Sequence, residues 1–229
     1  MKPPKNIVVV TGTDTEIGKT MVTAGLAYAL RERGVDVVAI KPVESGTTEE
    51  AGPVDDGAIL ARATGQSGPT EALVRLREPL APPVAADIDG VALDMGAWCD
   101  TIRDYAKSAD VVLVEGAGGL LSPLTWSETA RDLAATLDAS ALVVAPDKLG
   151  TLNQTLLVLE SLDHAGVPLA GVVFSATEFP DASSGRNAQT LRDFSGLARI
   201  AELPRVTDWR EAAEHLVDVS KWVFPTHQG

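Results

Sequence analysis

The sequence predicts an α/β fold, a single doubly wound domain whose mostly parallel central sheet is flanked by helices. Three observations predict it: short apolar runs alternate with amphipathic segments, a glycine-rich loop joins the first run to the first amphipathic segment, and 229 residues suit one domain of this class. We therefore expect residues 1–229 to form one domain. Right-handed crossovers would bring the carboxyl ends of the strands to one edge, where ligands bind.

The apolar runs are typical of buried parallel strands, because they are short, rich in Val and Ile, and do not alternate with polar residues. In chain order they are Ile7 to Val10, Val37 to Ile40, Val111 to Val114, Ala141 to Ala145 and Leu169 to Phe174. A weaker apolar run predicts a last strand at Ala198 to Ala201.

The segments between the strands predict helices. The first extends from Thr20 to Arg33, and its apolar residues recur at helical spacing before a C-cap glycine. The proline-rich stretch 78–90 predicts a loop, either at the ligand edge or elsewhere on the surface. Further helices are expected at residues 55–64, 94–107, 127–137, 151–165, 185–195 and 208–221.

The charge and hydropathy of the chain favour small-molecule chemistry. A net charge of −13 without a basic block is repelled by nucleic-acid backbones and by anionic lipid surfaces, so neither is an expected partner. No apolar run approaches the ~20 residues of a membrane span, and the first residues lack the features of a secretory signal. A single cysteine cannot form an internal disulfide, which is typical of a reduced cytoplasmic protein.

The stretch "TGTDTEIGKT" predicts a phosphate-binding loop between the first strand and the first helix, and hence a fold of the P-loop NTPase type. Its first glycine lies one residue earlier than the usual G-x-x-x-x-G-K-S/T spacing requires. In such loops backbone N–H groups surround the phosphates, the lysine reaches the β- and γ-phosphates, and the hydroxyl binds Mg2+. The extra residue predicts a wider loop, in which residues 13–16 project over the phosphates or beyond them. The residues expected to bind the nucleotide are Gly12, Thr13, Asp14, Glu16, Ile17, Gly18, Lys19 and Thr20.

A second lysine, Lys41, directly follows the second strand in "VVAIKPVESG". Its position at the ligand edge predicts an ammonium group beside the γ-phosphate, opposite Lys19. The alternative is a lysine that extends to the rim of the protein. Ser45 and Gly46 would provide hydrogen-bond donors close by.

An acidic residue, Glu115, ends the third strand, as the Mg2+-binding acid does in phosphate-loop enzymes. A buried carboxylate needs a partner, and a metal ion supplies one. Asp56, in "VDDGA", is a candidate for a further oxygen ligand, and Asp55 competes with it for this role. The alternative for either aspartate is a helix N-cap.

Four stretches, "TGTDTEIGKT", "KPVESG", "VEGAGGLLSPL" and "DKLGTLNQT", resemble the dethiobiotin synthetase family of the biotin pathway. They occur in the family's order, and the general pattern covers almost the whole chain. The loop with one extra residue is this family's own form of the phosphate loop. The resemblance implies a single P-loop ATP-dependent ligase domain that requires Mg2+. It would close a ureido ring on 7,8-diaminononanoate with CO2, through a carbamate and a carbamic–phosphoric anhydride, to give dethiobiotin, ADP and phosphate.

The resemblance also assigns roles to individual residues. Lys19 and Lys41 would stabilise the charge on the transferring phosphoryl group. The side chains that would hydrogen-bond the carbamate or the phosphate are those of Thr15 and Ser45. The metal ligands would be Thr20, Asp56 and Glu115. Further contacts with the substrate would come from Ser45, from Gly118, and from the N–H groups of Gly150, Thr151, Leu152 and Asn153, which open a helix.

The same helix start implies an assembly. In the family it receives the substrate's carboxylate tail from the neighbouring subunit of a homodimer, so the resemblance implies an active site at the subunit interface; an ordinary capped helix is the alternative.

One residue departs from the family's pattern. Ser175 stands where the family often has an asparagine that reads the adenine edge, and a serine cannot reproduce the amide's paired donor and acceptor. Base selectivity therefore stays open, while Pro204 fits the family's base-flanking turn.

A different class of function is a partner-regulated ATPase switch of the chromosome-partitioning or division-site type, which resembles this chain in its variant loop and fold. Such proteins typically carry an extra lysine early in the loop and a basic surface or an amphipathic tail. Here no lysine precedes Lys19 in the loop, and the last helix, "DWREAAEHLVDVSKW", is acidic and a poor membrane binder. A small-molecule kinase is a third alternative, but the sequence shows no arginine-rich lid.

Overall fold

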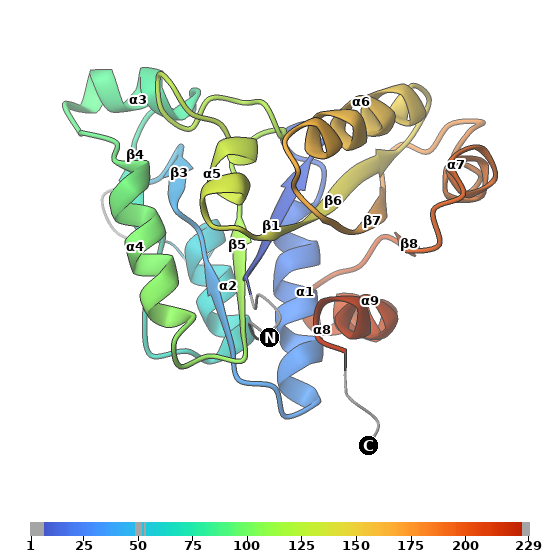
Figure 1. Cartoon of the computed structure of the whole chain (residues 1–229), viewed down its shortest axis with the longest axis horizontal. Coiled ribbons are helices and arrows are strands. Elements are labelled where there is room, and N and C mark those ends of the chain that lie inside the picture. The colour runs from blue at the N-terminus through green and yellow to red at the C-terminus, as the bar shows by residue number, and fades with distance from the viewer. Residues whose placement is uncertain (1–6, 49–51, 53, 226–229) are drawn as a thin grey trace.

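A six-stranded parallel sheet forms the centre of the computed structural model, which describes residues 7–48, 52 and 54–225. The strand order is β2–β5–β1–β6–β7–β8 (Figure 1). The strands are β1 (Ile7–Gly12), β2 (Val37–Ile40), β5 (Val111–Glu115), β6 (Ser140–Asp147), β7 (Leu169–Ala176) and β8 (Ile200–Leu203). The predicted fold class is confirmed, whereas residues 1–6 and 226–229 of the predicted domain lie outside the described ranges.

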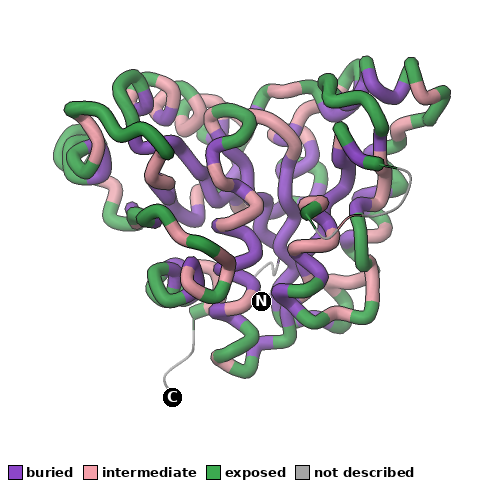
Figure 2. The backbone as a smooth tube through the Cα atoms, turned by 180° about the vertical axis from the view of Figure 1, so that it is seen from behind, coloured by how far each residue is buried: buried purple, intermediate pink, exposed green. Residues whose placement is uncertain are grey.

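Helices cover both faces of the sheet, because successive residues of each strand face opposite layers. Val9 of β1 packs in one hydrophobic core, and its neighbours Val8 and Val10 pack in the other. Figure 2 shows these buried strands running through the middle of the molecule. The helices on the side of Val8 are α1 (Lys19–Glu32), α2 (Asp56–Thr64), α8 (Trp209–His215) and α9 (Val217–Val223). Those on the side of Val9 are α4 (Met95–Tyr105), α5 (Ala130–Thr136), α6 (Thr151–His164) and α7 (Asn187–Ser195).

The strand register places charged residues at one edge of the sheet. Val10 of β1 pairs with Glu115 of β5, so this carboxylate lies beside the start of the phosphate loop. Ile40 of β2 pairs with Val114 of β5, so Lys41, one residue further, lies next to Glu115. Because every strand of this sheet is parallel, the residues after each strand meet at the same edge.

The helix expected at residues 127–137 begins three residues later, at Ala130. Thr129 and Asp132 form a capping box, in which each side chain accepts a hydrogen bond from the other residue's backbone N–H. The last strand is likewise shifted, from 198–201 to Ile200–Leu203. Among the helices of the described residues, none combines the length and the apolar character that crossing a membrane requires.

The prediction of a loop at residues 78–90 is wrong, because this stretch contains helix α3 (Pro82–Asp89). Pro82 and Pro83 occupy the first helical positions, where a missing N–H removes no helical hydrogen bond. Gly90 ends the helix with a φ of 67°, a conformation that glycine adopts without strain. The prolines that suggested a loop therefore start a helix.

The prediction of one helix at residues 208–221 is also wrong. The chain forms α8 and α9, which are separated at Leu216, whose φ of −102° and ψ of 9° depart from helical values. The Leu216 side chain is fully buried and packs beside Gly25 of α1, where an added Cβ would lie 3.1 Å from Leu216 Cδ1. Packing against α1 thus interrupts a segment whose sequence favours one continuous helix.

The sequence analysis missed a small parallel sheet made of β3 (Val43–Ser45) and β4 (Val74–Leu76). Each strand has three residues, which is too short for a recognisable apolar pattern. Strand β3 begins two residues after Lys41 and places Glu44 and Ser45 beside the ligand edge.

Candidate active site

The phosphate loop connects β1 to α1 and contains two residues with positive φ. Gly18 has a φ of 93°, and a Cβ at this position would lie 2.6 Å from Ser175 Oγ, so both conformation and space require glycine. Glu16 has a φ of 54°, which a residue with a side chain adopts only at a cost of about 1 kcal/mol or more. Strain of this kind is typical of loops whose backbone has to meet a ligand.

Two buried lysines, Lys19 and Lys41, lie at the ligand edge of the sheet. The Lys19 ammonium donates to the Asp14 carbonyl at 2.7 Å. Burial, with a contribution from the positive charge of Lys41, lowers the pKa of Lys19 to about 8. The Lys41 ammonium donates to Asp56 Oδ2 and to Glu115 Oε1, each at 2.7 Å. Although burial acts in the opposite direction, these two carboxylates raise the pKa of Lys41, which therefore stays charged.

Three oxygen-bearing side chains converge beside these lysines. Thr20 Oγ1 lies 2.7 Å from Asp56 Oδ1 and 2.8 Å from Glu115 Oε1, and its single proton can be donated to either. The Glu115 carboxylate is fully buried, which raises its pKa, and its Oε2 has no hydrogen-bond partner among the described residues. For Asp56, burial is outweighed by the charge of Lys41, which lowers the pKa of this carboxyl.

The chemistry of this cluster fits Mg2+. Hard oxygen donors suit the ion, and Glu115 Oε2 is a buried acceptor without a partner among the described residues, so it is available to a ligand. Within the described ranges no three His, Cys, Asp or Glu side chains group together as they do in an all-protein metal cage. Mg2+ usually takes only one or two carboxylates and completes its shell with water and substrate phosphates. Thr20, Asp56 and Glu115 therefore offer donors of the kind that Mg2+ takes, and their role as its ligands stays a prediction.

The two neighbouring aspartates have different surroundings. The Asp55 carboxylate accepts hydrogen bonds from Arg75 at 3.0 Å and from the Gly52 N–H at 2.8 Å. Asp56, one residue later, faces Thr20 and Lys41. Asp55 therefore holds the local chain together, and of the two only Asp56 is in contact with the oxygen cluster.

Glu44 is a site residue that the sequence analysis missed. Its side chain lies beside Asp56 and accepts hydrogen bonds from the backbone N–H groups of Asp56 at 2.5 Å and of Gly57 at 3.1 Å. Burial raises the pKa of Glu44, against the effect of these two donors. The one signal in the sequence was its place inside "KPVESG", and nothing there indicated a partner twelve residues away.

Most of the predicted residues surround one cavity of 710 Å³, which we call the first cavity. Pro79, Leu80 and Pro82 contribute apolar surface to it, as does Pro123. Ser45 Oγ is buried and has no partner among the described residues, so it is a donor available to a ligand. The predicted site residues that line the first cavity are Thr15, Glu16, Ile17, Gly18, Lys19, Thr20, Lys41, Ser45, Asp56, Glu115 and Gly118.

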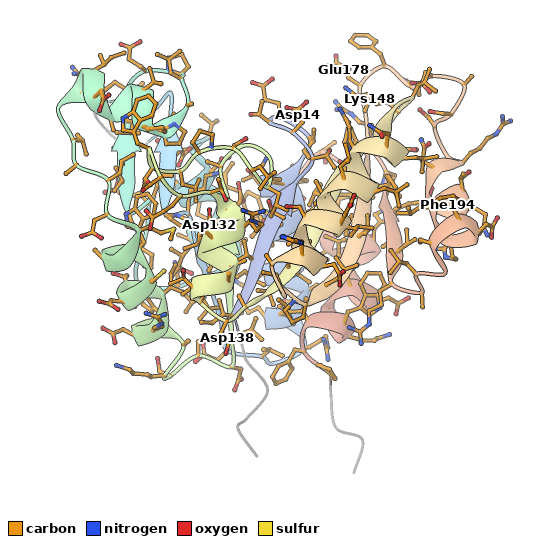
Figure 3. All side chains as sticks on the ribbon, turned by 45° about the horizontal axis from the view of Figure 1, so that its top comes forward. Asp14, Asp132, Asp138, Lys148, Glu178 and Phe194 are labelled. Atoms are coloured by element: carbon orange, nitrogen blue, oxygen red, sulfur yellow. The ribbon has the colours of Figure 1, made fainter. Side chains whose placement is uncertain are left out.

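A second cavity of 570 Å³ shares residues 15–18 of the phosphate loop with the first. Ser175 and Pro204 line it, as does Asp14. Asp14, Lys148 and Glu178, which all line the second cavity, project from one edge of the molecule in Figure 3, and Asp138 lies at the opposite edge. The two cavities therefore meet at the phosphate loop.

Some predicted residues lie elsewhere. Gly12 ends β1 and lines none of the three described cavities, and Thr13 lines a third, more open cavity of 480 Å³ beside α6. The start of α6, which was predicted to bind substrate, also lies outside all three cavities. Its residues are Gly150, Thr151, Leu152 and Asn153. Within one chain, the structure does not bring this helix start to the first cavity.

Sequence comparisons place the chain in a known family. A family model described as "AAA domain" matches residues 6–213. The ATP-dependent dethiobiotin synthetase BioD of Anaeromyxobacter sp. (strain Fw109-5) is 41% identical over 210 residues, which cover 90% of this chain and 93% of that protein. The corresponding protein of Mycobacterium leprae (strain TN) is 44% identical over 200 residues, covering 86% and 84%. That of Rhodococcus jostii (strain RHA1) is 40% identical over 226 residues, covering 96% of each chain.

Solved structures support the fold alone. The septum site-determining protein MinD from Pyrococcus horikoshii OT3, solved with Mg-ADP, has a TM-score of 0.63 and 16% identity, over 96% of each chain. A ParA family ATPase from Chlorobium tepidum TLS has a TM-score of 0.58 and 14% identity, over 94% of this chain and 98% of that one. Both similarities show a P-loop NTPase fold.

Proposed function

The chain belongs to the family of ATP-dependent dethiobiotin synthetases, ligases that form C–N bonds, and from this premise we propose its reaction. It converts 7,8-diaminononanoate, CO2 and ATP into dethiobiotin, ADP and phosphate, with Mg2+ as the required metal ion. The observation that carries the proposal is the first cavity, which two buried lysines line together with the oxygen cluster and the phosphate loop. Lys19 begins α1, and Lys41 directly follows β2. The whole chain, residues 1–229, acts as one catalytic domain.

The substrate supplies both nucleophiles, so the protein has to position groups and neutralise charge. One amine adds to CO2 and loses a proton, which gives a carbamate. A carbamate oxygen then attacks the γ-phosphorus, ADP leaves, and a carbamic–phosphoric anhydride forms. The second amine attacks the carbonyl carbon and loses a proton, phosphate leaves, and the ring closes. Lys19 and Lys41 stabilise the negative charge on the transferring phosphoryl group, while Thr15 and Ser45 orient the carbamate.

Lys41 has to exchange partners during this reaction. In the described structure its ammonium is paired with Asp56 and Glu115, which are also the proposed metal ligands. Asp56 and Glu115 would hold Mg2+, which when bound would supply positive charge to the phosphates and to these two carboxylates. The Lys41 ammonium would then be available to the γ-phosphate.

The first testable prediction is a coupling of phosphate release to both co-substrates. The purified protein is expected to release phosphate from Mg-ATP only when the diamine and bicarbonate are both present, because the carbamate is the attacking group. A phosphate-release assay with each component omitted in turn measures this. Release that instead responds to DNA or to anionic vesicles would identify a partner-regulated ATPase switch and contradict the proposal.

The second cavity is proposed to receive the nucleobase. Ser175, whose Oγ lies next to Gly18, offers a hydroxyl where an amide would present a paired donor and acceptor. Pro204 borders the same cavity. Running the phosphate-release assay with ATP, GTP, CTP and UTP under otherwise identical conditions measures the base preference.

A homodimer is the proposed assembly, because the predicted carboxylate-binding residues 150–153 lie outside the first cavity of their own chain. Leu121 and Leu157 line the third cavity with 54% and 57% of their surfaces exposed, which is typical of an interface between subunits. Leu157→Glu is expected to give a monomer with a strongly raised KM for the diamine. Light scattering after size-exclusion chromatography measures the molecular mass. Phe194→Glu, which changes an exposed apolar residue elsewhere, is the control. A wild-type protein that is monomeric at micromolar concentration would contradict this assembly.

A further inference from the structure

Glu44 caps a helix to which it does not belong. Its carboxylate accepts hydrogen bonds from the N–H groups of Asp56 and Gly57, which are the first two residues of α2. The first N–H groups of a helix have no acceptor within the helix, so an outside acceptor has to satisfy them. A carboxylate also interacts favourably with the partial positive charge at this helix end.

The residue expected to cap α2 is engaged elsewhere. Asp55 occupies the N-cap position, but its side chain makes no capping hydrogen bond. Its carboxylate accepts hydrogen bonds from Arg75 and from the Gly52 N–H. Glu44, from β3, therefore supplies the acceptor that the N-cap residue does not.

The start of α2 is also confined from a second side. A Cβ added to Gly57 would lie 2.2 Å from the Ala72 backbone nitrogen, so the helix start is pressed against residues 71–72. Glu44 holds the same turn by hydrogen bonds from the side of the first cavity. The backbone of Asp56 is thus held between two neighbours, and its side chain extends to Thr20 and Lys41.

We propose that Glu44 is a positioning residue, which holds Asp56 in place for the divalent cation. This inference rests on the proposed metal site. Glu44 itself need not contact the ion, because both of its oxygens bind backbone N–H groups. Outer-shell partners of this kind typically contribute about 10–100-fold to metal affinity.

The test measures binding of Mn2+ to the protein with ADP, by the loss of the free Mn2+ signal in electron paramagnetic resonance. Glu44→Ala is expected to weaken Mn2+ binding at least about tenfold. Glu44→Gln is expected to show a smaller loss, because its amide has one acceptor oxygen for two N–H groups. Glu44→Gln also preserves the volume of the side chain and keeps the test informative where the alanine variant does not fold.

A matched control comes from α8. The Asp208 carboxylate also accepts hydrogen bonds from two first-turn N–H groups, those of Arg210 and Glu211, at 2.8 and 3.1 Å. Asp208 does not line the first cavity, so Asp208→Ala removes a similar cap outside the proposed metal site and should lower the melting temperature without changing Mn2+ affinity. A loss in the Glu44 variants alone supports positioning of Asp56.

Two outcomes would overturn the inference, and they are distinguishable. If Asp56→Ala weakens Mn2+ binding but both Glu44 variants bind as the wild type does, Glu44 does not position Asp56 and the proposed metal site stands. If Asp56→Ala binds Mn2+ like the wild type, Asp56 is not a ligand, and both the inference and the proposed metal site fail.

Discussion

Lys41→Met is expected to reduce kcat by about 10²–10³ at saturating substrates, the magnitude typical of one removed donor to a charged transition state. Lys41 is almost fully buried and lines the first cavity together with the phosphate loop. Methionine fills a similar volume without the charge. Because the lysine is proposed to act on charge that develops during transfer, affinity for ADP in the absence of Mg2+ should change little. Steady-state kinetics and ADP calorimetry measure the two effects.

The same variant also tests the exchange of partners. In the Lys41→Met protein without Mg2+, Asp56 and Glu115 lack the ammonium that lies 2.7 Å from each in the wild type. Breaking a buried ion pair typically lowers the free energy of unfolding by about 3–5 kcal/mol. Mg-ADP should restore much of this stability, because the ion neutralises the same carboxylates. Urea unfolding with and without Mg-ADP measures the difference, with Lys107→Met, which removes an exposed pair with Asp104, as the control. A kcat equal to that of the wild type would remove Lys41 from the proposed mechanism.

The sequence predicts the central sheet well because burial on both faces leaves a strong local signal. The runs around Val8, Val38, Val112 and Val143 are apolar without alternation, which is typical of parallel strands between helix layers. The phosphate loop is also local, since its glycines and lysine lie within one short stretch. These features depend on neighbouring residues, so they can be recognised before any tertiary contact is known.

Features that depend on distant contacts were not predictable in the same way. Asp55 and Asp56 are equivalent in the sequence, and Arg75, twenty residues later, decides which of them is engaged. Glu44 caps α2 across twelve residues. The break at Leu216 results from packing on α1, whose sequence lies almost two hundred residues earlier. In each case a tertiary contact outweighs the local pattern.

Glu115→Gln is expected to weaken Mn2+ binding and to lower kcat/KM for Mg-ATP, each by about 100-fold or more, because a charged oxygen donor of the proposed metal site becomes neutral. The change keeps an acceptor that can remain at the position of Oε1, which Lys41 and Thr20 contact at 2.7 and 2.8 Å. The new amide nitrogen can occupy the position of Oε2, which has no partner among the described residues.

This variant separates the charge of Glu115 from its contribution to folding. Gln weakens the buried pair with Lys41, whose ammonium keeps its bond to Asp56, and leaves an amide donor unsatisfied, so a loss of about 1–3 kcal/mol in unfolding free energy is expected. Asp132→Asn, which changes a carboxylate in the capping box of α5, is the matched control and should leave Mn2+ affinity unaltered. A stable Glu115→Gln protein that binds Mn2+ as tightly as the wild type would show that the metal lies elsewhere. The buried Oε2 would then need a different partner, and Lys41 would be the natural one, because its ammonium already contacts the other oxygen of this carboxylate.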